Sequence, residues 1–307
     1  MDRDYRLFAT VIERGSLSAA GRELGLSPAA ASKRLAAMET RLGARLIHRT
    51  TRRLTTTEAG RAFYEAVRTI LAAVDAAEAQ VAGRAVSPSG PLRISAPTSF
   101  GRMHVAPTLP AFLDAHPAVQ IELLLDDGFT DLLADRIDLA IRIAPEPDAA
   151  SLAARLLAPN HRLLCAAPAY LERFGEPATL RDLAGHRLLA ASNQTPWRLE
   201  GAGARRNVEV ASHVVTNSSE VVRALALAGV GIALRSTWDV GAELASGALV
   251  RILPGWQGAT DVGIYAVHAR APLPAAVTAF ADHLAERFAP DAPWELGALR
   301  EPDRRGI

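Results

Sequence analysis

Apolar residues recur at helical spacing along the first part of the chain and divide it into three successive helices. The apolar positions within residues 7–12 fall on one face of a first helix. A second helix is predicted from about Ser18, a candidate N-cap, to Leu24, with its small residues and Leu24 turned inward. Gly25 is placed to end this helix, because glycine adopts the left-handed conformation without steric cost.

A third helix follows at once and leaves a polar face uncovered. Ser27 and Pro28 form an N-cap followed by proline at the first helical position, which is a strong start signal. The apolar residues at 31, 35, 38 and 42 form one stripe that faces a core. Small, hydroxyl and cationic side chains at the start of such a helix suit contacts to base edges in the major groove. The candidate reading residues are Ser27, Pro28, Ala29, Ala30, Ser32, Lys33 and Arg34.

Two short strands, 46–49 and 53–56, are predicted next, joined by a basic and hydroxylated turn. The turn resembles the wing of a winged helix-turn-helix and suits phosphate contacts through Thr50, Arg52 and Arg53. Residues 22–53 contain eight Lys and Arg against two Asp and Glu. Positive charge is therefore concentrated where a DNA duplex would lie. The alternative is a small helical domain with a solvated basic face.

A long helix is predicted from its cap at Thr57 to about Arg84, roughly 40 Å at 1.5 Å per residue. Its apolar positions step by four and three in alternation, which is a heptad seam. A helix that packs on its own domain usually has a wider apolar face, so the narrow seam favours a partner chain. The expected dimerisation residues are Phe63, Val67, Ile70, Val74, Ala77 and Val81. Residues 87–91, rich in proline and glycine, break the helix.

Beyond residue 91 short apolar strands alternate with helices, which is typical of α/β architecture with a mainly parallel sheet. The first series consists of strand 92–96, a helix near 103–115, strand 119–125, helix 129–134 and strand 139–141. The second series begins near Cys165 and contains a hairpin over 197–210, helix 218–228 and strand 230–234. Strand 265–268 and a helix over about 274–288 are expected to return to the first series.

Open α/β sheets bind ligands at the carboxyl ends of their strands, where helix N-termini converge. Hydroxyl-rich helix starts facing a cleft favour an anion. For Asn217 and Ser218 the alternative is plain capping of a helix, and Arg142 could instead pair with Asp138. The candidate effector-binding residues are Thr98, Ser99, Phe100, Phe129, Arg142, Ile143, Thr195, Trp197, Asn217 and Ser218.

Composition excludes several classes of function. Cys165 is the single cysteine, so an intrachain disulfide and a cysteine-based zinc site are excluded, and no metal site or cofactor is expected. The N-terminus lacks an apolar signal region, and no apolar run is long enough to span a bilayer. Nucleophile-elbow, Walker and zinc-protease motifs are also missing, so we expect no enzyme. We expect a cytoplasmic, nucleoid-associated protein. The alternatives are a small-ligand-binding protein of solute-binding type and a DNA-bending architectural protein.

The ordered motif in residues 7–60 resembles the N-terminal domain of the LysR-type transcriptional regulators along nearly its whole length. Many relatives carry glutamine where this chain has Pro28 or Ala29, which transfers base reading toward Ser32, Lys33 and Arg34. Three later strings, at 90–97, 138–143 and 228–234, resemble the effector domain of the branch that regulates organic-acid metabolism, including D-malate degradation.

The resemblance implies a multidomain fold with a winged helix-turn-helix, a linker helix and a two-lobed α/β effector domain similar to periplasmic binding proteins. It implies that the protein binds double-stranded DNA at an interrupted palindromic operator and also binds a small-molecule effector. It further implies assembly as a homodimer or homotetramer and RNA polymerase as a partner. The expected division is 1–58 for DNA binding, 59–89 for the linker helix and hinge, and 90–292 for the effector domain, with a tail at 293–307. Lobe I is expected over about 90–164 and 266–290, and lobe II over about 165–265.

Overall fold

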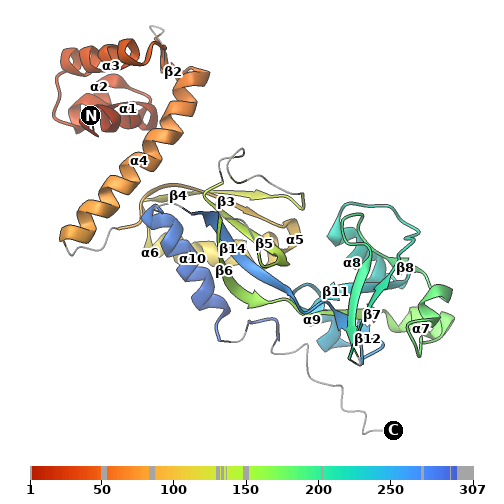
Figure 1. Cartoon of the computed structure of the whole chain (residues 1–307). Helices are drawn as coiled ribbons and strands as arrows, with labels where there is room; N and C mark the ends of the chain where they lie inside the picture. Colours follow the sequence, from red (N-terminus) through yellow and green to blue (C-terminus); the bar gives the residue numbers. More distant parts are fainter. Residues whose placement is uncertain are drawn as a thin grey trace. The chain divides into compact units, whose positions relative to one another are not determined.

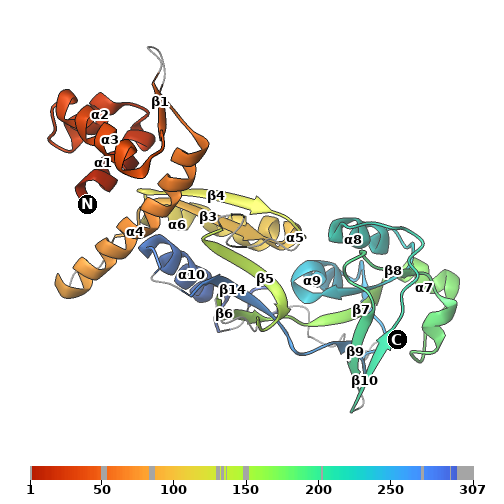
Figure 2. The same cartoon turned by 45° about the horizontal axis from the view of Figure 1, so that its top comes forward.

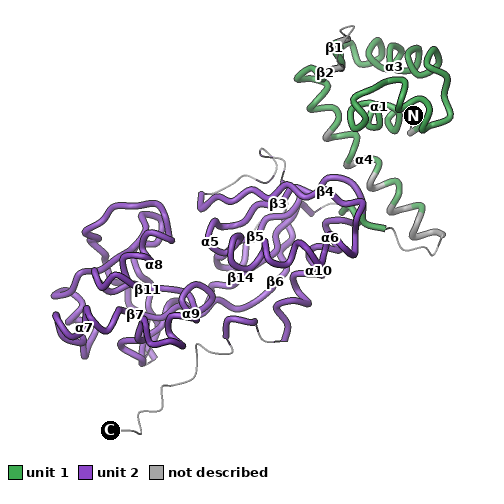
Figure 3. Tube along the Cα trace, turned by 180° about the vertical axis from the view of Figure 1, so that it is seen from behind, with its two compact units in different colours: residues 1–88, 272–275 green, residues 89–271, 276–307 purple. Residues whose placement is uncertain are grey.

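The computed structural model describes residues 2–49, 54–82, 87–128, 132, 135, 137–147, 152–201, 203–270, 273–290 and 292–295. The chain forms two compact units, residues 1–88 with 272–275 and residues 89–271 with 276–307 (Figure 3).

The first unit contains the predicted helix-turn-helix, wing and long helix (Figure 1). Its elements are α1 (Asp2–Arg14), α2 (Leu17–Glu23), α3 (Pro28–Leu42), β1 (Ile47–Arg49), β2 (Leu54–Thr56) and α4 (Glu58–Ala82). Strands β1 and β2 pair antiparallel, as predicted for a wing. Thr57 accepts a hydrogen bond from the Gly60 N–H at 2.8 Å, which confirms it as the cap of α4.

Two details of the second helix differ from the prediction. The N-cap of α2 is Ser16, whose side chain accepts a hydrogen bond from the Ala19 N–H, whereas Ser18 lies inside the helix. Leu24 is 37% exposed because it is the C-terminal cap and no longer on the inner face. Gly25 has φ +67°, the left-handed conformation expected of it at the end of the helix.

The wing is fixed to the helices by a buried carboxylate and a close backbone contact. Glu39 is 5% exposed and accepts hydrogen bonds from the backbone N–H groups of Leu46 and Ile47, at 2.8 and 3.2 Å. A Cβ at Gly60 would lie 1.9 Å from the Leu46 carbonyl oxygen, so α4 can pass this close to the wing only at glycine. The wing therefore has a defined position on the core of its unit.

The second unit begins with a five-stranded sheet in the order β4-β3-β5-β14-β6, which we call lobe I (Figure 2). Its strands are β3 (Gly90–Ala96), β4 (Val119–Leu125), β5 (Leu139–Pro145), β6 (Leu152–Pro159) and β14 (Val262–Ala269). Its helical segments are α5 (Thr98–Phe100), η1 (Gly101–Val105), η2 (Ala106–Thr108), α6 (Leu109–Ala115) and α10 (Ala275–Phe288).

Lobe II contains a four-stranded sheet, β12-β7-β11-β8, and a three-stranded sheet, β10-β9-β13. Its strands are β7 (Arg162–Ala166), β8 (Leu188–Leu189), β9 (Trp197–Gly201), β10 (Ala204–Val208), β11 (Ile232–Ser236), β12 (Val250–Arg251) and β13 (Gln257–Gly258). Its helices are α7 (Pro168–Phe174), η3 (Asp182–Gly185), α8 (Ser219–Leu227) and α9 (Thr237–Ser246). The chain passes between the lobes twice, from β6 to β7 and from β13 to β14.

The prediction of a mainly parallel sheet is wrong, because the crossing strands reverse the pairing. Strand β3 is parallel to β4 and β5, but β14 returns from lobe II and is antiparallel to both β5 and β6. In lobe II β11 is parallel to β8 and antiparallel to β7. The two-lobed α/β fold itself is confirmed, as are the predicted hairpin β9–β10 and the return of β14 to lobe I.

Two element boundaries in the second unit also differ from the prediction. The helical segment predicted from about Met103 begins at Thr98, and β11 begins at Ile232, two residues after the predicted start. Helices α7 and α9 and strand β6 were not predicted, and the helix expected over 129–134 lies largely outside the described residues. Trp294 and Glu295, beyond the predicted domain end at 292, pack on this unit: Trp294 is 8% exposed and Glu295 accepts a hydrogen bond from Thr237 at 2.7 Å.

Candidate functional site

Helix α3 exposes the polar face that the sequence predicts for DNA contact. Ser27 caps it by accepting a hydrogen bond from the Ala30 N–H at 3.2 Å. Ala31, Leu35 and Met38 are buried, whereas Ser27, Pro28, Ala29 and Lys33 are exposed; Ala30, Ser32 and Arg34 are partly buried. Leu42, the fourth member of the predicted stripe, is 39% exposed at the end of the helix.

The two cations of α3 stand in different environments. Lys33 is exposed, and among the described residues it has no ion-pair partner. Arg34 contacts the Asp4 carboxylate of α1 at 3.1 Å, so it must leave this partner to reach a base or a phosphate. Thr50, Arg52 and Arg53, the expected phosphate contacts of the wing, lie outside the described residues.

Helix α4 changes character along its length. Val67 is completely buried in the core of its own unit, and Phe63 packs against Tyr5 and Phe8 with ring centroids 5.7 and 5.4 Å away. The prediction that Val67 lies in an interchain seam is therefore wrong, because the first turns of α4 cover α1. Ile70 is 46% exposed and Val74 is partly buried. Ala77 and Val81 lie on α4, with side chains outside the described set.

A cavity of about 470 Å³ lies in the second unit, lined by both lobes. Lobe I contributes the end of β5 and the segments that follow β3 and β4. Lobe II contributes the starts of β7 and α8, residues within 193–198 and the last three residues of β11. The polar lining residues are Ser99, Asp127, Asn160, Arg162, Asn193, Gln194, Thr195, Arg198, Asn207, Ser219, Arg235 and Ser236. The cleft is bridged by hydrogen bonds from Arg102 to Glu220 at 2.9 Å and from Asn193 to the Asp127 carbonyl at 3.3 Å.

Three arginines and one aspartate set the charge of the cavity. Arg235 pairs with Asp239 and Arg198 pairs with Asp261 at 3.3 Å. Arg162 donates to the Leu234 carbonyl at 3.2 Å and has no carboxylate partner among the described residues. Burial, with smaller effects of Arg235 and Arg198, lowers the pKa of Arg162 to about 10. It stays charged at neutral pH, and Asp127 is the one carboxylate among the described lining residues.

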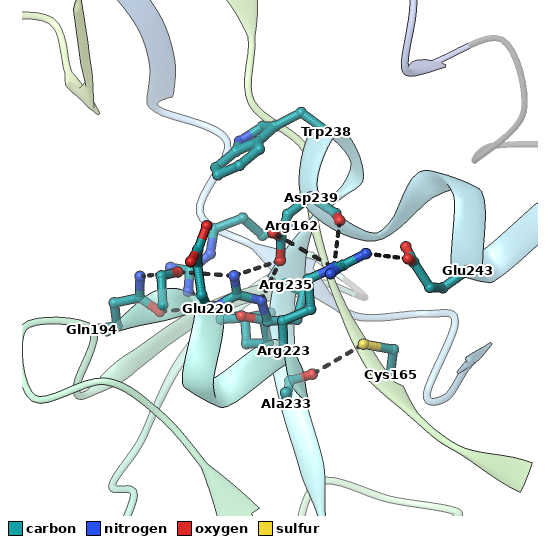
Figure 4. Close-up of polar contacts among 12 residues, drawn as sticks. Arg162, Cys165, Gln194, Glu220, Arg223, Ala233, Arg235, Trp238, Asp239 and Glu243 are labelled. Carbon is teal, nitrogen blue, oxygen red and sulfur yellow. Dashed lines mark hydrogen bonds and ion pairs between the residues drawn. The ribbon is translucent and has the colours of Figure 1, made fainter. Parts of the chain in front are cut away.

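The ion pair between Arg235 and Asp239 in lobe II is part of a buried network (Figure 4). Arg235 is 3% exposed and its Nε donates to Asp239 Oδ2 at 2.7 Å; the Asp239 side chain is 1% exposed. Arg223 donates to the Asp239 backbone carbonyl at 3.1 Å and contacts Glu243. The network joins α8, β11 and α9 and fixes the Arg235 guanidinium at the cavity wall.

Three of the predicted effector residues line the cavity: Ser99, Ile143 and Thr195. Trp197 and Phe100 do not, because both are core residues that are 1% and 0% exposed. Phe100 packs on Trp238, with ring centroids 5.3 Å apart, and Trp197 belongs to the core of lobe II. The prediction that these two residues belong to the effector site is wrong.

The other predicted residues that the structure describes are near the cavity without lining it. Arg142 donates to Ser95 Oγ at 3.3 Å, and burial lowers its pKa. The Thr98 N–H donates to Asp127 Oδ1 at 2.7 Å. Asn217 is exposed, and Ser218 occupies the N-cap of α8 without a capping hydrogen bond from its side chain. Phe129 lies outside the described residues.

Sequence reasoning missed Arg162, Gln194, Ser219 and Arg235. One signal was present: Arg235 interrupts the apolar run 230–234 at its end, and a charged residue that continues a buried strand requires a partner. Asp239, four residues later, supplies it on the next helix. Arg162 carried no such signal, since only the two crossings of the chain bring it to the cavity.

Among the described residues no helix is long and apolar enough to cross a membrane, and no cluster of metal-binding side chains occurs. Two family models match the chain: the bacterial regulatory helix-turn-helix protein of the lysR family over residues 3–61, and the LysR substrate binding domain over residues 85–289.

Relatives with this architecture match over most of their length. The chain is 38% identical to the HTH-type transcriptional regulator DmlR of Escherichia coli K12, covering 84% of this chain and 85% of that protein. It is 37% identical to the HTH-type transcriptional activator TtdR of Escherichia coli O6:K15:H31, covering 88% and 87%.

Solved structures agree. Full-length AphB, a Vibrio cholerae virulence activator, is 28% identical with a TM-score of 0.60, covering 92% of this chain and 98% of that one. The LysR-type regulator CrgA of Neisseria meningitidis is 27% identical with a TM-score of 0.60, covering 93% and 98%. These matches confirm a transcriptional regulator and not an enzyme. The chain belongs to the family of LysR-type transcriptional regulators.

Proposed function

We propose that this regulator reads an interrupted palindromic operator through helix α3 and responds to a small carboxylate bound in the interlobe cavity. The observation that carries the effector proposal is the charge of the lining, above all Arg162, which has no carboxylate partner among the described residues. A partly buried cation without a counterion is unfavourable, and an anionic ligand relieves this cost. The 470 Å³ volume has room for a small organic acid.

The Asp127 side chain also lines the cavity and opposes anion binding. Arg198 and Arg235 are paired with Asp261 and Asp239, so the opposing charges of the lining are Arg162 and Asp127. Asp127 Oδ1 already accepts a hydrogen bond from the Thr98 N–H at 2.7 Å, and the N–H donors of three arginines reach the lining, which supports an anion over a cation. Polar side chains from both lobes would order a ligand that also carries hydroxyl groups.

We infer that the reading unit works as a homodimer joined by the outer half of α4, and that effector domains associate dimers into tetramers. Ligand binding would then shift the balance between arrangements that bend DNA differently, provided that the two arrangements differ in ligand affinity. We also propose that the protein contacts RNA polymerase and is associated with the nucleoid in the cytoplasm.

Isothermal titration of the full chain with small carboxylates tests the effector site. Arg162→Gln should weaken carboxylate binding about 10- to 100-fold, the value of a charge-assisted hydrogen bond. Arg198→Gln is the matched control: it lines the same cavity but is already neutralised by Asp261, so its loss should be smaller. Equal affinity in the wild type and the Arg162 variant would contradict the proposed site.

A further inference from the structure

Ser219, the first residue of helix α8, lies in the cavity lining within a fixed pattern of donors and acceptors. Its hydroxyl oxygen accepts a hydrogen bond from Arg235 Nη2 at 2.8 Å. It accepts a second one from Gln194 Nε2 at 3.3 Å. The amide oxygen of Gln194 faces Arg235 Nη1 at 3.5 Å. The three side chains therefore form a closed set of contacts at the cavity wall. Gln194 and Arg235 of this set are labelled in Figure 4.

The direction of every bond in this set follows from the chemistry of arginine. A guanidinium has donors and no acceptor, so Gln194 must present its carbonyl oxygen to Arg235. The amide NH₂ of Gln194 then faces Ser219, and the serine oxygen receives hydrogen from both neighbours. Among the described residues, no acceptor receives the hydrogen of the Ser219 hydroxyl itself. That hydrogen is left for a ligand.

A second hydroxyl lines the cavity from the opposite lobe. Ser99 is 2% exposed, and its oxygen is buried without a hydrogen-bond partner among the described residues. A buried hydroxyl without a partner is costly, which indicates that a group absent from the chain itself completes its bonding. Arg235 orients Ser219 but is not expected to attract the ligand by its charge, because Asp239 already pairs with it.

We propose that Ser219 is a specificity-determining residue of the cavity, oriented by Arg235 and Gln194 as an obligate donor, so that the site selects a carboxylate over a group that also donates. This inference rests on the proposed effector site. A carboxylate only accepts, and it receives the hydrogens of Ser219 and Ser99 while Arg162 supplies charge. An amide of the same shape can accept the Ser219 hydrogen only through its carbonyl oxygen, turns its NH₂ toward the other donors and carries no charge for Arg162.

The test compares succinate with succinamide, which share a carbon skeleton, by isothermal titration of the full chain. Wild type should bind succinate at least about 10-fold more tightly. Ser219→Ala should weaken succinate about 10- to 100-fold and succinamide only a few fold, since a hydrogen bond to a charged group is worth more than a neutral one. Ser219→Thr keeps the hydroxyl and should keep the preference, with unfolding temperatures checking that each variant is folded.

The outcomes separate the two proposals. A wild-type chain that binds neither compound, or binds both equally, would overturn the anionic effector site and this inference with it. A wild-type preference that persists in Ser219→Ala would leave the effector site standing and overturn the role of Ser219. Equal loss of preference in the alanine and threonine variants would show that the shape of the side chain matters and not its donated hydrogen, which also overturns the inference.

Discussion

Helix α3 and the interlobe cavity both carry arginine or lysine side chains where we propose that an anion binds, but the two regions hold these cations in opposite ways. Lys33 is exposed, and Arg34 shares a partly exposed contact with Asp4. In the cavity Arg235 is 3% exposed and its carboxylate partner Asp239 is 1% exposed. A surface cation is held loosely and screened by salt, whereas a buried cation must be fixed by partners. The first arrangement suits a long polyanion, and the second suits a small ligand of defined shape.

The largest expected effect is on the buried pair. Arg235→Gln leaves the Asp239 carboxylate without its main partner and should lower the free energy of unfolding by about 3–5 kcal/mol. Arg198→Gln is the control, because the Arg198–Asp261 pair is half exposed and should cost less than about 1 kcal/mol. Urea unfolding measures both. Similar losses in the two variants would remove the distinction between buried and exposed cations.

The next effect concerns assembly through α4. Ile70→Asp with Val74→Asp places charges on the outer half of the helix and should weaken the dimer by about 3 kcal/mol, since a buried unpaired charge is strongly unfavourable. Light scattering and circular dichroism should show a monomer with folded domains. Val67→Asp is the contrast: its side chain is completely buried within one chain, so it should unfold the first unit. An unchanged dimer mass in the first variant would exclude the outer half of α4 as the interface.

A smaller effect is expected on base reading. Arg34→Ala should cost about 1–3 kcal/mol on the specific operator and less on random DNA. Lys33→Ala is the comparison, because Lys33 is exposed and, unlike Arg34, has no ion-pair partner among the described residues that it must leave to contact DNA. Fluorescence anisotropy over a salt series measures each loss, and an effect that is equal on both DNAs would show that these residues contact only phosphates.

The smallest effect is a dependence on pH at the crossing between the lobes. The carboxylate of Glu295 accepts a hydrogen bond from His161 at 3.1 Å and raises the pKa of His161 above its ordinary value. The stabilisation is complete below about pH 6.5 and is lost as the pH rises through the raised pKa. Unfolding temperature should therefore fall slightly more over this range in wild type than in His161→Gln. If the unfolding temperatures of wild type and His161→Gln changed in parallel with pH, the result would contradict a stabilising contact between His161 and Glu295.

The sequence predicts the order and type of the elements of the first unit because its signals are local. Caps at Ser27 and Thr57 and the glycine at 25 each act within one turn of the chain, and the structure has all three where the sequence predicts them. Ser16 replaced Ser18 as a cap because two serines stand near the same helix start, and local pattern does not separate them.

The cavity was predicted only in part because its residues come from distant segments. Ser99 and Thr195 follow from the rule that strand ends form sites, but Arg162 reaches the lining only because the chain crosses between the lobes. The same rule made Trp197 a candidate effector-binding residue, yet its large ring fills the core of lobe II, where the side chain is 1% exposed. The burial of Trp197 depends on how β9 packs against the rest of lobe II, and the sequence of the strand alone does not predict this packing.

We propose that a carboxylate bound in the cavity controls the affinity of the DNA-reading unit for its operator. The most direct measurement is the affinity of the full chain for an operator selected in vitro, with and without the small carboxylate that raises its unfolding temperature most. We predict a change of about 5- to 150-fold in wild type, the usual range of allosteric coupling, and little change in Arg162→Gln. The same operator affinity with and without that carboxylate in the wild-type chain would contradict the claim.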